Sequence, residues 1–118
     1  MPVLQTFSGF EMAMMCGAFL AAAEKKMVLM IDGFIASAAF LCAFKINPKV
    51  KDFAVFCHLS EEKGHQLLLE YLEVKRLLNL DMRLGEGTGC AVAYPLLKSA
   101  VAFFNEMASF ESAGVSDK

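Results

Sequence analysis

The sequence lacks an apolar run long enough to cross a membrane. Its two longest apolar runs cover residues 12–23 and 33–44, well short of the roughly 20 residues that a spanning helix needs. No basic segment precedes an apolar one near Met1, so the pattern of a secretory signal peptide is missing as well. We therefore expect a cytoplasmic protein without a membrane partner.

Cysteine motifs are also missing. The four cysteines lie far apart and form no CxxC pair, a pattern typical of reduced, buried thiols in the cytosol. A zinc site built on Cys57, His58 and His65 would need a second cysteine pair or an HExxH spacing, and neither is present. We expect no disulfide and no metal ion. The cysteines are Cys16, Cys42, Cys57 and Cys90.

A concentrated patch of positive charge is absent too. Lys and Arg number 11 against 13 Asp and Glu, which gives a formal net charge of −2. The basic residues are scattered along the chain and are not interleaved with aromatic residues. Nucleic acid is therefore not an expected partner.

What the sequence has in excess is apolar residues. They make up 57% of the chain, against about 45–50% in an ordinary soluble protein. Because the apolar runs are too short for a membrane, we interpret the excess as apolar faces that must be covered. The cover would come from a partner subunit or from sequence that this chain does not contain.

Short apolar runs alternate with helical patterns along the chain. Runs without polar alternation, such as residues 27–31 and 53–58, indicate strands that are covered on both faces. Ser8, with Glu11 three residues later, matches a capping box at the start of the first helix. The expected helices cover about residues 8–25, 34–44, 65–73 and 89–110, and the expected strands cover 27–31, 53–58 and 77–80.

This order predicts an α/β fold with a parallel sheet and right-handed crossovers. Three parallel strands alone would leave two unpaired edges and weakly covered faces, whereas parallel sheets are usually buried on both faces. We therefore interpret residues 1–118 as a single portion of a larger α/β domain. It would be part of a doubly wound parallel sheet with helices on both faces, ending in a long C-terminal helix. That helix carries one apolar stripe, formed by Val92, Leu96, Ala100, Phe103, Met107 and Phe110.

Polar residues follow each expected strand. Ligands of open parallel sheets bind outside the carboxyl ends of the strands, so these residues should face one crevice. Asp32, before Gly33, could cap a helix, hold a ribose hydroxyl or hold an active-site loop. Ser60 could cap the next helix or bind a phosphate. His65 fits a structural, hydrogen-bonding role better than a catalytic one.

The loop at residues 83–89 (RLGEGTG) is the most informative segment. Its alternating glycines permit positive φ and a close approach of backbone to ligand, and it leads into a helix N-terminus that favours anions. Glu86 could be a capping group or a general base, and Arg83 adds a donor for phosphate or carboxylate. The spacing is neither the GxGxxG dinucleotide motif nor a Walker loop.

These motifs occur in an order that resembles a known family. Asp32-Gly33-Phe34-Ile35, the segment 60–65 and the RLGEGTG loop are together similar to the C-terminal third of nicotinate-nucleotide–dimethylbenzimidazole phosphoribosyltransferase. The resemblance covers essentially all 118 residues. It departs at Ser8, where the family has glycine. Enzymes of this family are about three times longer than this chain.

The resemblance implies transfer of phosphoribose from nicotinate mononucleotide to 5,6-dimethylbenzimidazole, giving α-ribazole 5′-phosphate and nicotinate with inversion at the anomeric carbon. Glu86 would be the catalytic base, Ser60 would donate to the 5′-phosphate, and Asp32 would lie at the floor of the crevice. No cofactor or metal would be needed, and the assembly would be a homodimer. The other implied or expected substrate-binding residues are Arg83, Leu84, Gly85, Gly87 and Gly33.

Three interpretations stay open. The chain is a C-terminal fragment of such a transferase, with little or no turnover by itself. Alternatively, it is a non-catalytic truncated module that self-associates or binds a full-length enzyme. A third interpretation is a transferase for a different base, such as adenine or a phenolic compound.

Overall fold

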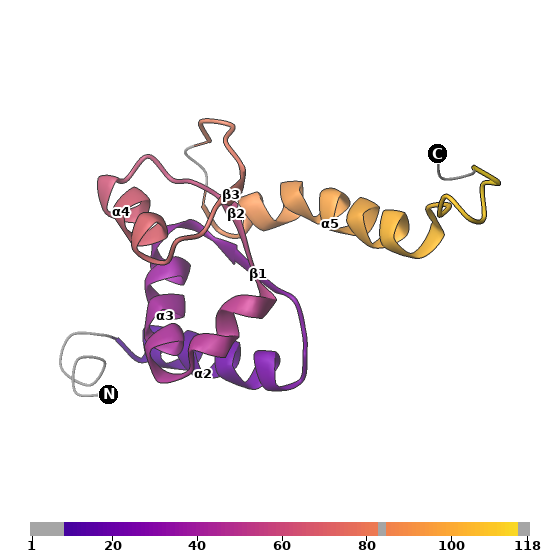
Figure 1. Cartoon of the computed structure of the whole chain (residues 1–118). Coiled ribbons are helices and arrows are strands. Elements are labelled where there is room, and N and C mark those ends of the chain that lie inside the picture. The colour runs from indigo at the N-terminus through magenta and orange to yellow at the C-terminus, as the bar shows by residue number, and fades with distance from the viewer. Residues whose placement is uncertain (1–8, 83–84, 116–118) are drawn as a thin grey trace.

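The computed structural model describes residues 9–82 and 85–115, and its core is a parallel three-stranded sheet (Figure 1). The strands β1 (Leu29–Asp32), β2 (Ala54–His58) and β3 (Arg76–Leu78) lie in the order β1-β2-β3. They alternate with the helices α2 (Phe10–Glu24), α3 (Gly33–Ile46), α4 (Lys63–Tyr71) and α5 (Thr88–Glu106). A 3-10 helix, η1 (Pro48–Phe53), precedes β2. The predicted α/β class and the predicted order of helices and strands are confirmed.

Several boundaries differ from those predicted. Helix α2 begins at Phe10, and its N-cap is Gly9, which makes no side-chain capping bond; the predicted cap, Ser8, lies outside the described residues. Helix α5 ends at Glu106 and not near Phe110, because Met107 adopts an extended backbone while its N–H closes the last turn on the carbonyl of Phe103.

The apolar core lies between the sheet and helices α2, α3 and α4. The ring of Phe40 on α3 is fully buried and meets Phe19 and Phe56 edge to face, with ring centroids 5.7 and 5.2 Å away. Such pairs add about 0.5–1.5 kcal/mol beyond the area they bury. Leu29 and Ile31, which alternate along β1, enter the same cluster. The chain therefore builds one core on one face of its sheet.

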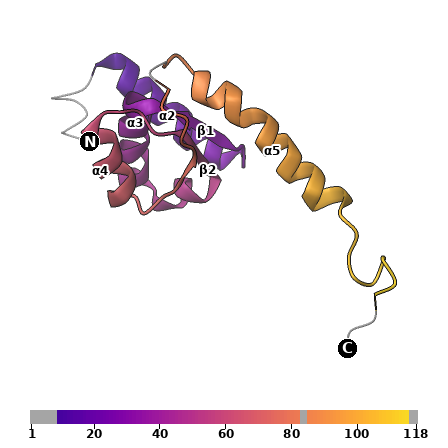
Figure 2. The same ribbon diagram turned by 90° about the horizontal axis from the view of Figure 1, so that it is seen from above.

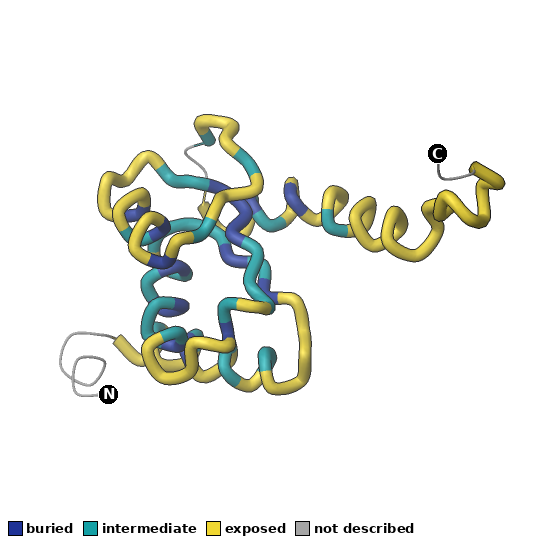
Figure 3. Tube along the Cα trace, viewed as in Figure 1, coloured by how far each residue is buried: buried dark blue, intermediate teal, exposed yellow. Residues whose placement is uncertain are grey.

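Helix α5 extends away from the sheet and the helices that cover it. Its first turns contact all three strands, where Gly89 and Ala93 are buried, and the remainder extends away from the sheet on the side opposite α3 (Figure 2). Beyond the first turns, α5 is exposed almost all round (Figure 3). Phe103 is 65% exposed and Phe104 is 92% exposed. The predicted stripe lies only partly on α5, because Met107 and Phe110 come after the helix ends at Glu106. Its members on the helix are exposed, and no part of the chain described here covers them.

Within residues 9–82 and 85–115, no helix has the length and apolar character needed to span a bilayer.

Candidate functional site at the strand ends

A pocket of about 470 Å³ lies at the carboxyl ends of β1 and β2. Five of the residues that were predicted to bind ligand line it: Asp32, Gly33, Ser60, Gly85 and Glu86. Gly87 follows Glu86 directly in the same turn. Arg83 and Leu84 lie outside the described residues. The fold thus brings together three segments that are distant in sequence, at the edge where parallel sheets bind ligands.

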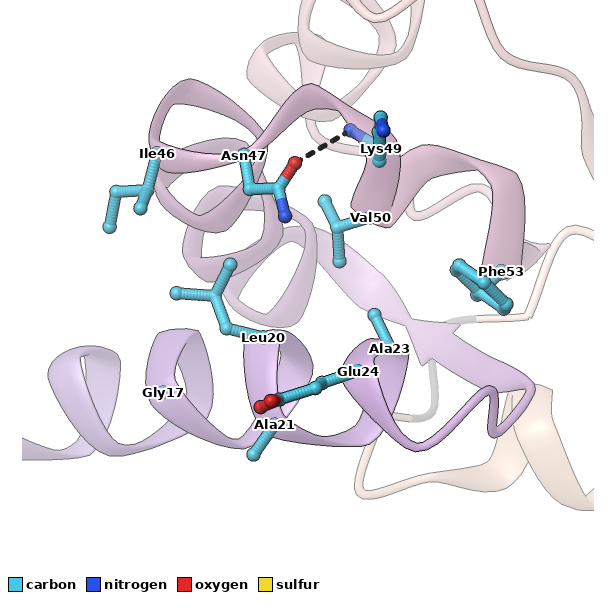
Figure 4. Close-up of a pocket in the computed structure, with 10 residues that line it drawn as sticks. All are labelled: Gly17, Leu20, Ala21, Ala23, Glu24, Ile46, Asn47, Lys49, Val50 and Phe53. Carbon is cyan, nitrogen blue, oxygen red and sulfur yellow. Dashed lines mark hydrogen bonds between the residues drawn. The ribbon is translucent and has the colours of Figure 1, made fainter.

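A second pocket, of about 700 Å³, lies between α2 and η1 (Figure 4). It is lined by Leu20, Glu24 and Phe53 among others, and Asn47 accepts the N–H of Lys49 at its rim. Since α2 precedes β1 and η1 precedes β2, this pocket lies at the amino ends of the strands. None of the predicted site residues lines it, so the pocket at the other end of the sheet is the candidate functional site.

Asp32 connects β1 to the start of α5. A register irregularity between Ile31 and Asp32 brings Asp32 level with His58 on β2, as bulges near active sites often do. Asp32 occupies the N-cap position of α3 but makes no capping bond there. Its Oδ2 instead accepts the backbone N–H of Gly89 at 3.2 Å. Of the roles considered for Asp32, this geometry corresponds to the one that holds a loop.

Gly89 is required at this contact by its lack of a side chain. A Cβ at this position would collide with the Asp32 carboxylate and would lie 2.9 Å from the Cβ of His58. Because the His58 Cβ is fixed to the strand, it has little room to move. The close approach of α5 to β1 and β2 therefore depends on glycine at position 89.

Glu86 lies in a turn with a left-handed backbone. The N–H of Thr88 donates to the carbonyl of Gly85 at 3.2 Å, and the Thr88 hydroxyl donates to the same oxygen at 2.8 Å. Glu86 and Gly87, between them, have φ of 60° and 82°, the pattern of a type I′ turn. Glu86 is exposed beside the pocket. A non-glycine residue in this conformation is uncommon, and of the four in the described chain only Glu86 lines the pocket; the others are Lys26, Glu73 and Asp81.

His65 is the centre of a buried hydrogen-bond network beneath the pocket. Its Nδ1 lies 3.0 Å from the backbone nitrogen of Ser60 and 2.9 Å from the Ser60 hydroxyl. Its Nε2 lies 3.0 Å from the hydroxyl of Ser37, which donates to the carbonyl of Gly33 at 2.7 Å. Burial lowers the pKa of His65, so the ring is neutral near pH 7. Ser60 does not cap α4, whose N-cap is Glu62.

Two reactive side-chain types, His58 and Cys57, lie at the end of β2. His58 is 3% exposed, and its Nε2 has no hydrogen-bond partner within the part of the chain that the structure describes. Burial and a hydrogen bond with Cys90 raise the pKa of Cys57 to about 12, so it remains a thiol. The described residues contain no group of three or more His, Cys, Asp or Glu side chains placed to hold a metal ion.

A family model described as phosphoribosyltransferase matches residues 1–115. The chain belongs to this phosphoribosyltransferase family. A protein of Cupriavidus taiwanensis named nicotinate-nucleotide–dimethylbenzimidazole phosphoribosyltransferase is 60% identical over 114 residues, which are 97% of this chain and 33% of that protein. A protein of the same name from Dechloromonas aromatica is 61% identical over 116 residues, 98% of this chain and 33% of its own length.

The likeness extends to three dimensions. The crystal structure of nicotinate-nucleotide–dimethylbenzimidazole phosphoribosyltransferase from Thermus thermophilus superposes with a TM-score of 0.89 at 40% identity, over 98% of this chain and 35% of that one. This chain spans about a third of the length of the curated relatives it matches.

The candidate site also contains residues that the sequence did not indicate. Gly89 was noted only as the third alternating glycine, although its spacing was the available signal. Ser37 stands within the apolar run of residues 33–44, and a lone polar residue in such a run was the only sign of its role. His58 lines the pocket beside Asp32, at the strand end where the polar residues were expected to face the crevice, but no role other than metal binding was predicted for it.

Proposed function

We propose that this chain forms the C-terminal third of a nicotinate-nucleotide–dimethylbenzimidazole phosphoribosyltransferase, and that Glu86 is its catalytic base. The observation that carries the proposal is the position of Glu86. It is held in a left-handed turn beside the pocket that Asp32 and Ser60 also line, in a chain of this family. Strained backbone at a pocket fits a residue kept for chemistry and not for folding.

The reaction needs a base at this place. One ring nitrogen of 5,6-dimethylbenzimidazole attacks the anomeric carbon of nicotinate mononucleotide while its other nitrogen loses a proton to the Glu86 carboxylate. The bond from that carbon to the pyridinium nitrogen breaks, and its electron pair stays on that nitrogen, which loses its positive charge as nicotinate departs. Attack opposite the leaving group inverts the anomeric carbon. A carboxylate both takes the proton and stabilises the positive charge that develops on the azole.

The remaining site residues would bind and orient the substrates. The Ser60 hydroxyl would donate to the 5′-phosphate, and Asp32 would hold the start of α5 through Gly89, which keeps the Glu86 turn in place. Backbone at Gly33, Gly85 and Gly87 would lie close to the flat ring. Arg83 and Leu84 are proposed to line the base and phosphate subsites of the same loop.

A chimera tests this function. This chain would replace the matched third of the Cupriavidus taiwanensis relative, and formation of α-ribazole 5′-phosphate from the two substrates would be measured. Activity in the chimera, and a loss of about 10²–10⁴-fold in kcat with Glu86→Gln, would support the proposal. Glu24→Gln, at the amino-end pocket, is the matched control. A Glu86→Gln variant as fast as the unchanged chimera would contradict the role of Glu86.

A second function is favoured by the exposed side chains of α5. The chain could act without catalysis, binding a longer transferase or another copy of itself through this helix. An inactive chimera, together with co-purification of the 118-residue chain with the Cupriavidus taiwanensis relative, would favour this alternative. Co-purification that persists when Phe103 and Phe104 are changed to lysine would exclude the helix as the contact.

A further inference from the structure

His65 joins two of the three segments that form the pocket. It lies in the first turn of α4, is 1% exposed, and uses both ring nitrogens. One nitrogen faces Ser60, after β2, and the other faces Ser37 on α3, which in turn bonds to Gly33 after β1. The ring therefore connects the carboxyl ends of both strands through hydrogen bonds.

The bonds determine which nitrogen carries the proton. The backbone N–H of Ser60 can only donate, so Nδ1 must be an acceptor without hydrogen. The proton of the neutral ring is then on Nε2, which donates to the Ser37 hydroxyl. That hydroxyl donates a hydrogen bond to the carbonyl of Gly33. The three hydrogen bonds therefore all run in one direction, from the Ser60 N–H through His65 and Ser37 to the Gly33 carbonyl.

The same geometry leaves the Ser60 hydroxyl available to a ligand. Nδ1 has a single lone pair, and the backbone N–H of Ser60 already points at it. The hydroxyl, 2.9 Å away, shares that lone pair as a second donor. Its hydrogen can turn to a stronger acceptor, such as an anionic oxygen in the pocket that Ser60 lines.

We propose that His65 is a positioning residue, which holds Ser60 so that its hydroxyl donates to a phosphate-ester oxygen of the substrate. This inference rests on the proposed function, because it assigns the Ser60 end of the pocket to phosphate. His65 itself touches no substrate. It acts by keeping the β2 end and the β1 end at a set separation, through Ser60 on one side and Ser37 and Gly33 on the other.

The hydrogen bonds from Ser60 through His65 to Ser37 and Gly33 form a link between the two strand ends. The charges around the His65 ring determine how this link responds to acid. Burial is the largest effect on His65 and lowers its pKa, and nearby His58 acts in the same direction. Glu62, at the start of α4, and Asp32, at the end of β1, oppose them. A protonated ring would direct an N–H from Nδ1 against the N–H of Ser60. The link is therefore present at neutral pH and is broken by protonation of His65.

Two substitutions separate the two halves of the link. In His65→Asn, the amide oxygen takes the place of Nδ1 and can accept the N–H of Ser60. In His65→Gln, the amide nitrogen takes the place of Nε2 and can donate to Ser37, while the bond to Ser60 is lost. In the chimera, we expect His65→Gln to raise KM for nicotinate mononucleotide about 10-fold, the lower range for a hydrogen bond to a charged group. His65→Asn should restore most of that loss, and Gln66→Ala, exposed on α4, should change nothing.

Three comparisons decide the outcome. With Ser60→Ala already present, His65→Gln should add less than about a twofold loss, because the two residues act as one unit. Nicotinate riboside, which lacks the phosphate, should be used equally well with and without His65→Gln. Equal damage from His65→Asn and His65→Gln, or the same loss on both substrates, would overturn the proposal and leave His65 with a structural role only.

The tautomer gives a readout that needs no catalysis. In the 118-residue chain, nitrogen chemical shifts of the His65 ring should show a protonated Nε2 and a bare Nδ1 at pH 7.5. A proton on Nδ1 would overturn the positioning role even in an active chimera. An inactive chimera with the expected tautomer would contradict the proposed function and its phosphate assignment, while the link from Gly33 to Ser60 would stand.

Discussion

At the scale of single residues, the start of α5 combines a strained backbone with a close contact. Glu86 adopts φ of 60° beside Gly87 at 82°, a conformation that costs an L-residue about 1–2 kcal/mol. Three residues after Glu86, Gly89 touches both Asp32 and His58. The strained turn at Glu86 directly precedes α5. The contact of Gly89 with Asp32 holds the first turn of that helix, and it thereby fixes the place of the turn.

Gly89→Ala should destabilise the chain. The added methyl group meets the Asp32 carboxylate and the fixed Cβ of His58, and overpacking of this kind costs about 1–3 kcal/mol. Urea unfolding measured by circular dichroism would report the change. Gly17→Ala on α2 is the matched control, because nothing lies within 4 Å of its Cβ, and it should stabilise the chain by about 0.5–1 kcal/mol. Equal effects at the two glycines would contradict the contact.

Cysteine reactivity should follow exposure and thiolate formation. Cys16 and Cys57 are buried, and burial raises the pKa of both, that of Cys57 to about 12. Cys90 is only half-buried, although burial raises its pKa as well. Since the thiolate is the reactive form, iodoacetamide at pH 8 should label Cys57 more slowly than Cys90. Peptide mapping by mass spectrometry would show this, and early labelling of Cys57 would be inconsistent with the packing of β2 against α5.

At the scale of elements, α3 and α4 are connected by a polar link inside an apolar layer. Ser37 and His65 are both buried, and their hydrogen bond crosses between the two helices. An unpaired buried polar group costs about 1–3 kcal/mol. The link therefore makes the placement of α4 dependent on the protonation of one ring.

Acid should weaken folding through this link. The pKa of His65 lies below its ordinary value of 6.5 in the folded chain, so below pH 6.5 the unfolded chain binds more protons than the folded one. The contribution is complete above pH 6.5 and is lost as pH falls through that value toward the folded pKa, by at most ~1.36 kcal/mol per pH unit. Unfolding midpoints between pH 7.5 and 5 would show the slope. His65→Asn, which cannot titrate, should flatten it.

Although β3 (Arg76–Leu78) is mostly exposed, the order of elements was predictable because β1 and β2 are apolar runs without regular polar alternation. Residues 53–58 show this directly, as β2 occupies Ala54–His58. The candidate site was predictable in part, since residues that follow parallel strands meet at one edge and Asp32, Ser60 and Glu86 line one pocket. The bond from Gly89 to Asp32 was not, because it joins residues 57 positions apart and no local pattern encodes such a pairing.

At the scale of the whole molecule, the chain is elongated. Its radius of gyration is 17.1 Å and its extents are 61 × 32 × 23 Å, whereas a compact domain of this length has a radius of about 13.5 Å. The difference comes from α5, which extends away from the sheet (Figure 2). Its exposed aromatic side chains account for part of the high apolar fraction of the sequence.

The apolar side chains of α5 should make the purified chain self-associate. Phe103 and Phe104 are exposed on the part of the helix beyond the sheet, and contiguous apolar surface of this kind promotes association. Changing both to lysine should raise the monomer fraction in light scattering. Leu67→Lys on α4, which is 66% exposed in the native chain, is the control and should have little effect. A monomer from the unchanged chain would contradict this expectation.

The exposure of α5 should also affect how long the protein survives in a cell. Chaperones and proteases recognise apolar side chains that stay accessible after folding, and α5 presents such side chains until it is covered. The half-life of the chain would then depend on how quickly the helix is covered. Cellular abundance would follow the supply of whatever occupies α5, even if the three-stranded body were stable by itself.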